Sequence, residues 1–169
     1  MLDRLVYQQY IMQKKGRMQS EEMGKKDGNT SHIIHTAIKT QVVNINQKVA
    51  SRGVRVVNAI RNAELEVLKG QRSGKVYRKP YSKATYTASA PGEPPARQTG
   101  NLRLHWNGQV KSKNIFNGGI AIIAELESQE SYASYLENGT SKMAARPFVE
   151  EIKKKAAPEI KKIYSEPYT

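Results

Sequence analysis

One segment of nearly forty residues has the hydrophobic periodicity of a single long helix. Between residues 31 and 69, apolar or small side chains recur every three or four positions, which places them on one stripe of a helix. The stripe consists of Ile34, Ile38, Val42, Ile45, Val49, Gly53, Val56, Ile60, Ala63 and Val67. Ser31 is the expected N-cap and Gly70 the expected stop. A helix of this length, about 58 Å, is too long for a compact domain of this size to cover alone.

The same segment carries a second apolar stripe, roughly opposite the first, made of Val43, Val54, Val57, Leu65 and Leu68. A helix that is apolar on two sides is usually buried from two sides. In one interpretation the first stripe packs on the chain's own sheet and the second on a neighbouring subunit. Val54, Val57, Leu65 and Leu68 are then interface residues. The alternative is a pair of helices kinked near Gly53, each burying its stripe internally.

The following segment, residues 70–98, is basic, aromatic and proline-containing, and predicts a long loop or a β-hairpin extension. Residues 31–86 carry 11 basic and 2 acidic residues, a net charge of +9 out of +13 for the chain. Such a block is either a solvated basic face or a surface for nucleic acid or an acidic protein. The candidate contact residues in this loop are Arg72, Tyr77, Arg78, Tyr81 and Tyr86. Because tyrosine and arginine dominate protein hot spots and duplex DNA exposes no free bases, protein contact is favoured.

The rest of the chain predicts a small sheet and a second helix. Residues 104–111 and 120–126 have strand character, with Trp106 in the core, and Asn117-Gly118-Gly119 is a turn signal between them. Residues 132–137 predict a helical turn. Pro147 opens a C-terminal helix that Pro158 is expected to kink or restart. The predicted fold class is α+β, a long helix in the N-terminal half and a C-terminal helix packed on a small antiparallel sheet of three to five strands.

The domain organisation follows from the same patterns. Residues 1–22 carry a moderate helix signal, and residues 24–30 have the composition of a linker. Residues 1–30 therefore form a helical arm and linker, which either docks on a neighbouring subunit or packs on its own chain. Residues 31–169 form a single domain with the extended loop 70–98.

Several classes of function find no support. The chain has no cysteine, which excludes disulfides and thiolate zinc sites, and it has no apolar run long enough for a membrane span. The segment 70–76 fails the phosphate-loop spacing, and His32 and His35 are a solvated helix start rather than a metal pair. Glu125 and Glu127 share a strand face without other catalytic groups. We therefore expect no enzyme, metal or cofactor.

Two separated motifs carry a resemblance to a known family. The first is Ala90-Pro91-Gly92-Glu93-Pro94-Pro95 with Thr99-Gly100-Asn101-Leu102-Arg103. The second comprises Tyr132, Tyr135, Leu136, Glu137, Gly139 and Thr140, then Lys142, Met143, Ala145, Arg146, Pro147 and Phe148. In this order they resemble the head–tail joining proteins of long-tailed bacteriophages, also called neck, minor head or tail-completion proteins. The resemblance covers roughly residues 31 to 165.

The resemblance implies a structural virion protein of the neck, assembled in the host cytoplasm. Identical copies would form a ring, of six or twelve, between a head-closure or connector protein and a tail terminator or tail tube protein, with contact to packaged DNA as an option. The second motif would hold the fold, and Arg146 is a candidate ion-pair partner of Glu137. The alternative is a basic nucleic-acid-binding protein, whose binding weakens steeply with salt.

Overall fold

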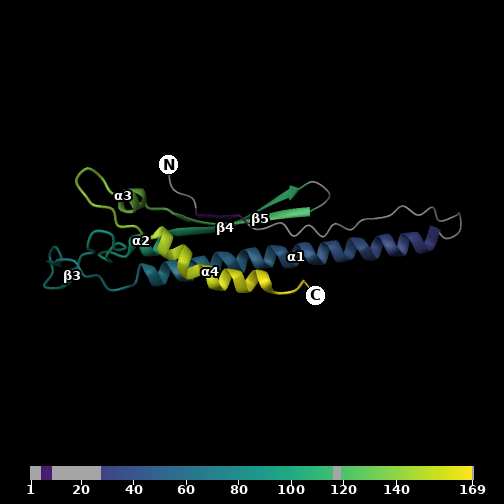
Figure 1. The fold of residues 1–169 in the computed structure, drawn as a ribbon, viewed down its shortest axis with the longest axis horizontal. Helices are drawn as coiled ribbons and strands as arrows, with labels where there is room; N and C mark the ends of the chain where they lie inside the picture. The colour runs from purple at the N-terminus through teal and green to yellow at the C-terminus, as the bar shows by residue number, and fades with distance from the viewer. Residues whose placement is uncertain (1–4, 9–27, 116–118, 169) are drawn as a thin grey trace.

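The computed structural model describes residues 5–8, 28–115 and 119–168. The long helix α1 (Gly28–Val67) runs along one face of a sheet formed by β1 (Leu5–Gln8), β4 (Trp106–Ile115) and β5 (Gly119–Ser128). The C-terminal helix α4 (Val149–Ser165) packs beside the second half of α1, whose first half extends beyond the other described elements (Figure 1). The predicted α+β class, with two helices on a small antiparallel sheet, is confirmed.

The sheet has the strand order β1-β5-β4, with both neighbouring pairs antiparallel. β4 and β5 are paired along their whole length, from Trp106 opposite Ser128 to Ile115 opposite Gly119. A second, separate sheet consists only of the hairpin β2 (Val76–Arg78) and β3 (Thr85–Thr87). Two short helices, α2 (Asn101–Leu104) and α3 (Ala133–Asn138), flank the two long strands in sequence.

Two glycines let α1 approach the sheet closely. A Cβ atom on Gly53 would lie 2.5 Å from Cγ2 of Ile122 and 2.9 Å from Cγ1 of Val110. A Cβ atom on Gly108 of β4 would lie 2.5 Å from Cγ1 of Val57. At each of these contacts a glycine on one element makes room for a branched side chain of the other. α1 is one continuous helix, so the kinked pair at Gly53 is wrong: this glycine serves helix–sheet packing.

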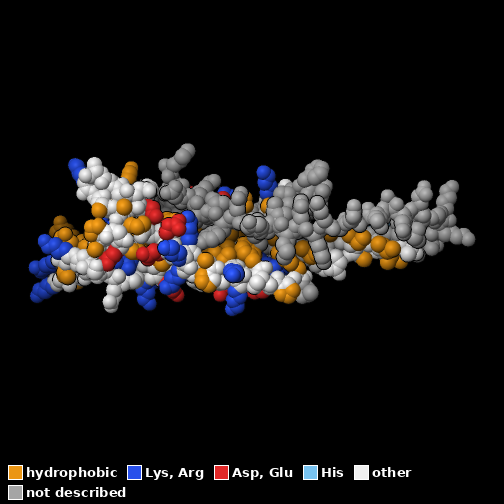
Figure 2. Space-filling view, in the orientation of Figure 1, with side chains coloured by type: hydrophobic (Ala, Val, Ile, Leu, Met, Phe, Trp, Pro, Cys, Tyr) orange, Lys and Arg blue, Asp and Glu red, His pale blue; other side chains and the backbone are white. Residues whose placement is uncertain are grey.

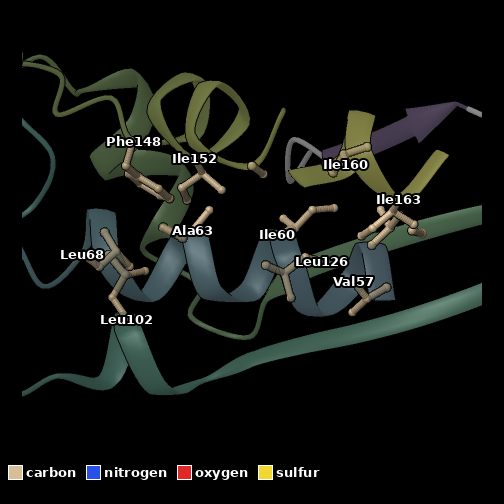
Figure 3. Close-up of a cluster of buried hydrophobic side chains, with 14 residues drawn as sticks. Val57, Ile60, Ala63, Leu68, Leu102, Leu126, Phe148, Ile152, Ile160 and Ile163 are labelled. Atoms are coloured by element: carbon tan, nitrogen blue, oxygen red, sulfur yellow. The ribbon is translucent and has the colours of Figure 1, made fainter. Parts of the chain in front are cut away.

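The core lies between the second half of α1, α4 and the sheet (Figure 3). Ile60 and Ala63 of α1 face Ile152 and Ile160 of α4, and further buried residues are Val56, Val57, Leu68, Leu102, Ala124, Leu126, Phe148 and Ile163. Trp106 packs against this cluster, with its ring edge-on to Phe148 at a centroid distance of 6.2 Å. The prediction that Trp106 contacts the core is confirmed.

Some predicted boundaries are wrong. Residues 5–8 form strand β1 on β5 rather than part of a helix, because a strand with open hydrogen-bonding groups lies beside them. The remainder of the predicted arm lies outside the described residues, but α1 begins at Gly28, inside the predicted linker. α4 runs unbroken through Pro158, and Pro147 precedes its first residue by two positions.

Candidate interaction surfaces

The first half of α1 has an apolar stripe that nothing in the described part of the chain covers. Four residues on the stripe that is buried further along the helix are 42–55% exposed: Ile34, Ile38, Val42 and Ile45. Figure 2 shows hydrophobic side chains along this end of the molecule. We call residues 30–50 the bare half of α1. Its only charged side chains are Lys39 and Lys48, apart from two histidines.

The opposite stripe is divided between the core and the surface. Val57 and Leu68 are buried in the subunit core, so their assignment to a subunit interface is wrong. Val57 is covered because Gly108 lets β4 approach it, and Leu68 because the chain turns after α1 ends. Val54 remains 52% exposed and Leu65 is half-buried. Val43 and Val54 are the exposed members of this stripe.

The hairpin β2–β3 stands at the opposite end of the molecule from the bare half (Figure 1). Its tip residues, from Arg78 to Lys83, enclose a shallow hollow of about 450 Å³. Tyr81 at the tip has a left-handed backbone, with φ 56°, and a fully exposed side chain. The hairpin form of the predicted 70–98 loop is thus the one observed, and lysine and arginine gather at this end in Figure 2.

The candidate contact residues of this loop have different environments. Tyr77 and Tyr86 stack on each other across the hairpin, with ring centroids 5.9 Å apart. Arg72 is half-buried at the base, where it donates hydrogen bonds to the carbonyl oxygens of Val67 (2.7 Å) and Pro95 (3.2 Å). Desolvation lowers the pKa of Arg72. Arg72 therefore anchors the loop to the end of α1, and its contact with a partner stays a prediction.

A carboxylate fixes the other side of the loop base. Glu93 accepts hydrogen bonds from the Ser73 hydroxyl and from the backbone N–H groups of Ser73 (3.1 Å) and Ala90 (2.9 Å). These bonds, led by that of the Ser73 hydroxyl, lower the pKa of Glu93 to about 2. The hairpin is therefore fastened at its base, while its tip projects into solvent.

The second motif forms the entry to α4. One oxygen of Glu137 accepts hydrogen bonds from the backbone N–H groups of Phe148 (2.8 Å) and Val149 (3.2 Å). Glu137 thus caps α4, and the expected ion pair with Arg146 is wrong. Gly139 has φ 75°, and a Cβ atom there would lie 2.8 Å from the Met143 carbonyl oxygen. Both observations assign the motif a structural role.

Other motif residues complete this turn or lie on its surface. Thr140 bridges to Met143, and the backbone N–H of Arg146 bonds the Leu136 carbonyl oxygen at 2.7 Å. Pro147 is half-buried beside the buried Phe148, whereas Tyr135 and Lys142 are exposed. The two motifs meet across a groove of about 440 Å³ lined by Arg97, Thr99, Leu102, Tyr132, Leu136 and Arg146, among others. Sequence order gave no sign of this meeting.

Two arginines of α1 hold residues 166–168 against this helix. Arg52, 4% exposed, donates hydrogen bonds to the carbonyl oxygens of Glu166 (2.6 Å) and Pro167 (2.8 Å) and lies 3.7 Å from the centre of the Tyr168 ring. Arg55 forms a two-pronged ion pair with the Glu166 carboxylate. We call residues 166–168 the C-terminal strap. The strap contacts α1 just after the bare half ends, at Arg52 and Arg55.

One buried acid stands in the core. Glu64 is 0% exposed, pairs with Arg61, and has one carboxylate oxygen without a hydrogen-bond partner. Burial raises its pKa to about 7, against the opposing charges of Arg61 and Arg103. The charged groups that act on Glu64 are Arg61 and Arg103, and neither is an acid or a nucleophile that could share a catalytic step with it.

The described residues contain no group of three metal-binding side chains, and none of their helices combines the length and hydropathy that crossing a bilayer requires. No family model, curated protein or solved structure matches the chain. Among the described residues, most of the exposed large hydrophobic side chains lie on the bare half of α1 and on the hairpin.

Proposed function

We propose that this chain is a structural protein of the neck of a long-tailed phage, which joins the DNA-filled head to the tail as a ring of identical subunits. The observation that carries the proposal is the bare half of α1. The described part of the subunit leaves about half of its longest helix uncovered, with the same stripe that is buried elsewhere along that helix. Large exposed apolar stripes mark surfaces for association.

The occupant we propose for the bare half is a second copy of this chain. The bare half has two exposed apolar faces: Ile38 and Val42 belong to one, and Val43 belongs to the other, which continues to Val54 further along the helix. If one face of each copy packs on the other face of the next, the contact is head-to-tail. Head-to-tail contacts close into rings when the rotation between copies permits. The absence of acidic residues between positions 28 and 50 favours apolar packing over ion pairing.

In this proposal the protein acts by assembly rather than by catalysis. A ring of six or twelve copies would present one side to a head-closure or connector protein and the other to a tail terminator or tail tube protein. The two motifs support this function through the resemblance they carry and through their structural role at α4. The protein would be made in the host cytoplasm and reside in the virion neck.

The test is electron microscopy of particles from a phage that lacks this gene. We expect DNA-filled heads and separate tails, which join when purified protein is added. An Ile38→Glu protein should fail to restore joining, because it places a charge in the subunit contact. Asn44→Glu, on a polar face of the same exposed helix, is the matched control and should restore it. Intact tailed virions without the gene would contradict the proposal.

A further inference from the structure

The hairpin β2–β3 concentrates positive charge without any acidic residue. Between Glu66 and Glu93 the chain has six lysines and arginines and no aspartate or glutamate. Four of them lie in or beside the hairpin: Lys75, Arg78, Lys79 and Lys83. None of these four has a carboxylate partner among the described residues. Their charge is therefore available to an anionic partner.

The shape of the hairpin suits a duplex groove. It is a two-stranded antiparallel ribbon, in which Val76 pairs with Thr87 and Arg78 with Thr85, and it projects from the body at a base fixed by Arg72 and Glu93. A two-stranded ribbon is one of the two elements that the major groove of B-form DNA admits. At the tip, Arg78 donates a hydrogen bond to the Ser82 carbonyl oxygen at 2.8 Å, which stiffens the turn.

The tyrosines argue against base stacking and against a protein hot spot. Tyr77 and Tyr86 stack on each other, so that neither offers both ring faces to a base. Protein hot spots are built on aromatic or arginine anchors inside packed, desolvated pockets. At the tip the residues of these types are Arg78 and Tyr81, and both side chains are exposed rather than held in a pocket. Contact with phosphates needs neither a free base nor a packed anchor.

We propose that the hairpin, from Lys75 to Thr87, binds duplex DNA through its phosphates, using Lys75, Arg78, Lys79 and Lys83. We call this segment the finger. The binding is independent of sequence, because the contacts are made to the backbone. The inference goes beyond the joining function and does not depend on it. If the ring forms, each copy contributes a finger, and the linked fingers bind more strongly than one.

The experiment measures the fluorescence anisotropy of a labelled 30-base-pair duplex over a range of salt concentrations. The tip variant replaces Lys75, Arg78, Lys79 and Lys83 with glutamine. The control variant replaces four exposed lysines elsewhere, Lys142, Lys154, Lys161 and Lys162. Both reduce the net charge from +13 to +9 by losing four cations. Thermal unfolding of both variants checks that each remains folded.

We expect wild-type binding to weaken with salt, with a slope of about −0.9 in log K against log salt for each phosphate contact. The tip variant should lose about 3 to 4 of that slope and at least tenfold in affinity at low salt. The control variant should keep most of both. Equal losses in the two variants would overturn the proposal, since diffuse charge would then explain the binding.

Absence of duplex binding by the wild type at low salt would also overturn the proposal, and would leave an acidic protein surface as the partner. The Ile38→Glu protein distinguishes a failure of this inference from a failure of the proposed joining function. It should retain the salt dependence of each finger even if it no longer assembles. Light scattering measures whether the ring assembles, whereas anisotropy measures whether the hairpin binds DNA.

Discussion

Glu137 caps helix α4 through a 2.8 Å hydrogen bond from the backbone N–H of Phe148, the residue just before the helix begins. The bond ties α3 to the start of α4, across the turn in which Gly139 has a left-handed backbone. Phe148 in turn places its ring in the core against Trp106. The second motif thus couples a helix start to core packing, which explains its combination of acid, glycine and aromatic residues.

Replacing Glu137 with alanine should destabilise the subunit, because two backbone N–H groups lose their charged acceptor. We expect a loss of about 1–3 kcal/mol in the free energy of unfolding, measured with urea. Glutamine at this position keeps an acceptor oxygen and should cost less. Arg146→Gln is the control for the rejected ion pair. If Arg146→Gln destabilised the protein as much as Glu137→Ala, the cap would not be the main role of Glu137.

The regular elements of the fold followed from periodicity and strand character. The 3.6-residue repeat predicted α1, and strand character predicted β4 and β5. Of the turn signal between them, Gly119 is the first residue of β5, and Asn117 and Gly118 lie outside the described residues. The predictions that failed concern contacts between distant segments. Val57 and Leu68 have the same helical spacing as surface residues, and only the approach of Gly108 and the turn after α1 bury them.

In the candidate surfaces, too, the sequence did not predict contacts between residues that are distant along the chain. The basic composition of the hairpin was visible, but Arg72 could be assigned to its base only from its bonds to Val67 and Pro95. The buried position of Arg52 depends on the strap, more than a hundred residues away. Such contacts leave no local pattern, because the partner's position is fixed by the tertiary fold.

The buried Glu64 predicts a pH-dependent stability. Its pKa is about 7 in the folded protein, above the ordinary value of 4.5, so the folded state holds a proton that the unfolded state has lost between these values. The stabilising contribution is full below pH 4.5 and is lost as pH rises through about 7. Glu64→Gln should remove this slope and stabilise the protein at pH 8, by at most on the order of 3 kcal/mol. Urea unfolding at pH 5, 6, 7 and 8 measures it; an unchanged slope in the variant would contradict the assignment.

Gly53→Ala should destabilise the protein although alanine is the better helix former. The added methyl group would meet the branched side chains of Ile122 and Val110, which have little rotamer freedom to move away. We expect the overpacking, about 1–3 kcal/mol, to exceed the gain in helix propensity of about 1 kcal/mol. Ser51→Ala, at an exposed position of the same helix, is the control. A higher melting temperature for Gly53→Ala would show that α1 is not in close contact with the sheet at this position.

The strap should be held mainly by Arg52. Arg52→Met removes two hydrogen bonds to the strap carbonyl oxygens and should cost about 1–3 kcal/mol in the free energy of unfolding. Truncation after Ser165 removes the same contacts from the other side. The combined change should therefore be clearly less than the sum of the two single changes. Additive effects would mean that Arg52 stabilises the fold through something other than the strap.

The central claim, that the bare half of α1 packs on a second copy, is tested most directly by multi-angle light scattering of the purified protein. The chain has a mass of 19.0 kDa. We expect the wild type and Asn44→Glu to have the mass of a closed ring of several copies, and Ile38→Glu to fall to the mass of one chain that still unfolds cooperatively, at a lower melting temperature because the subunit contact is lost. A wild type that remains a single chain at all concentrations, or an Ile38→Glu protein that keeps the mass of the ring, would contradict the claim.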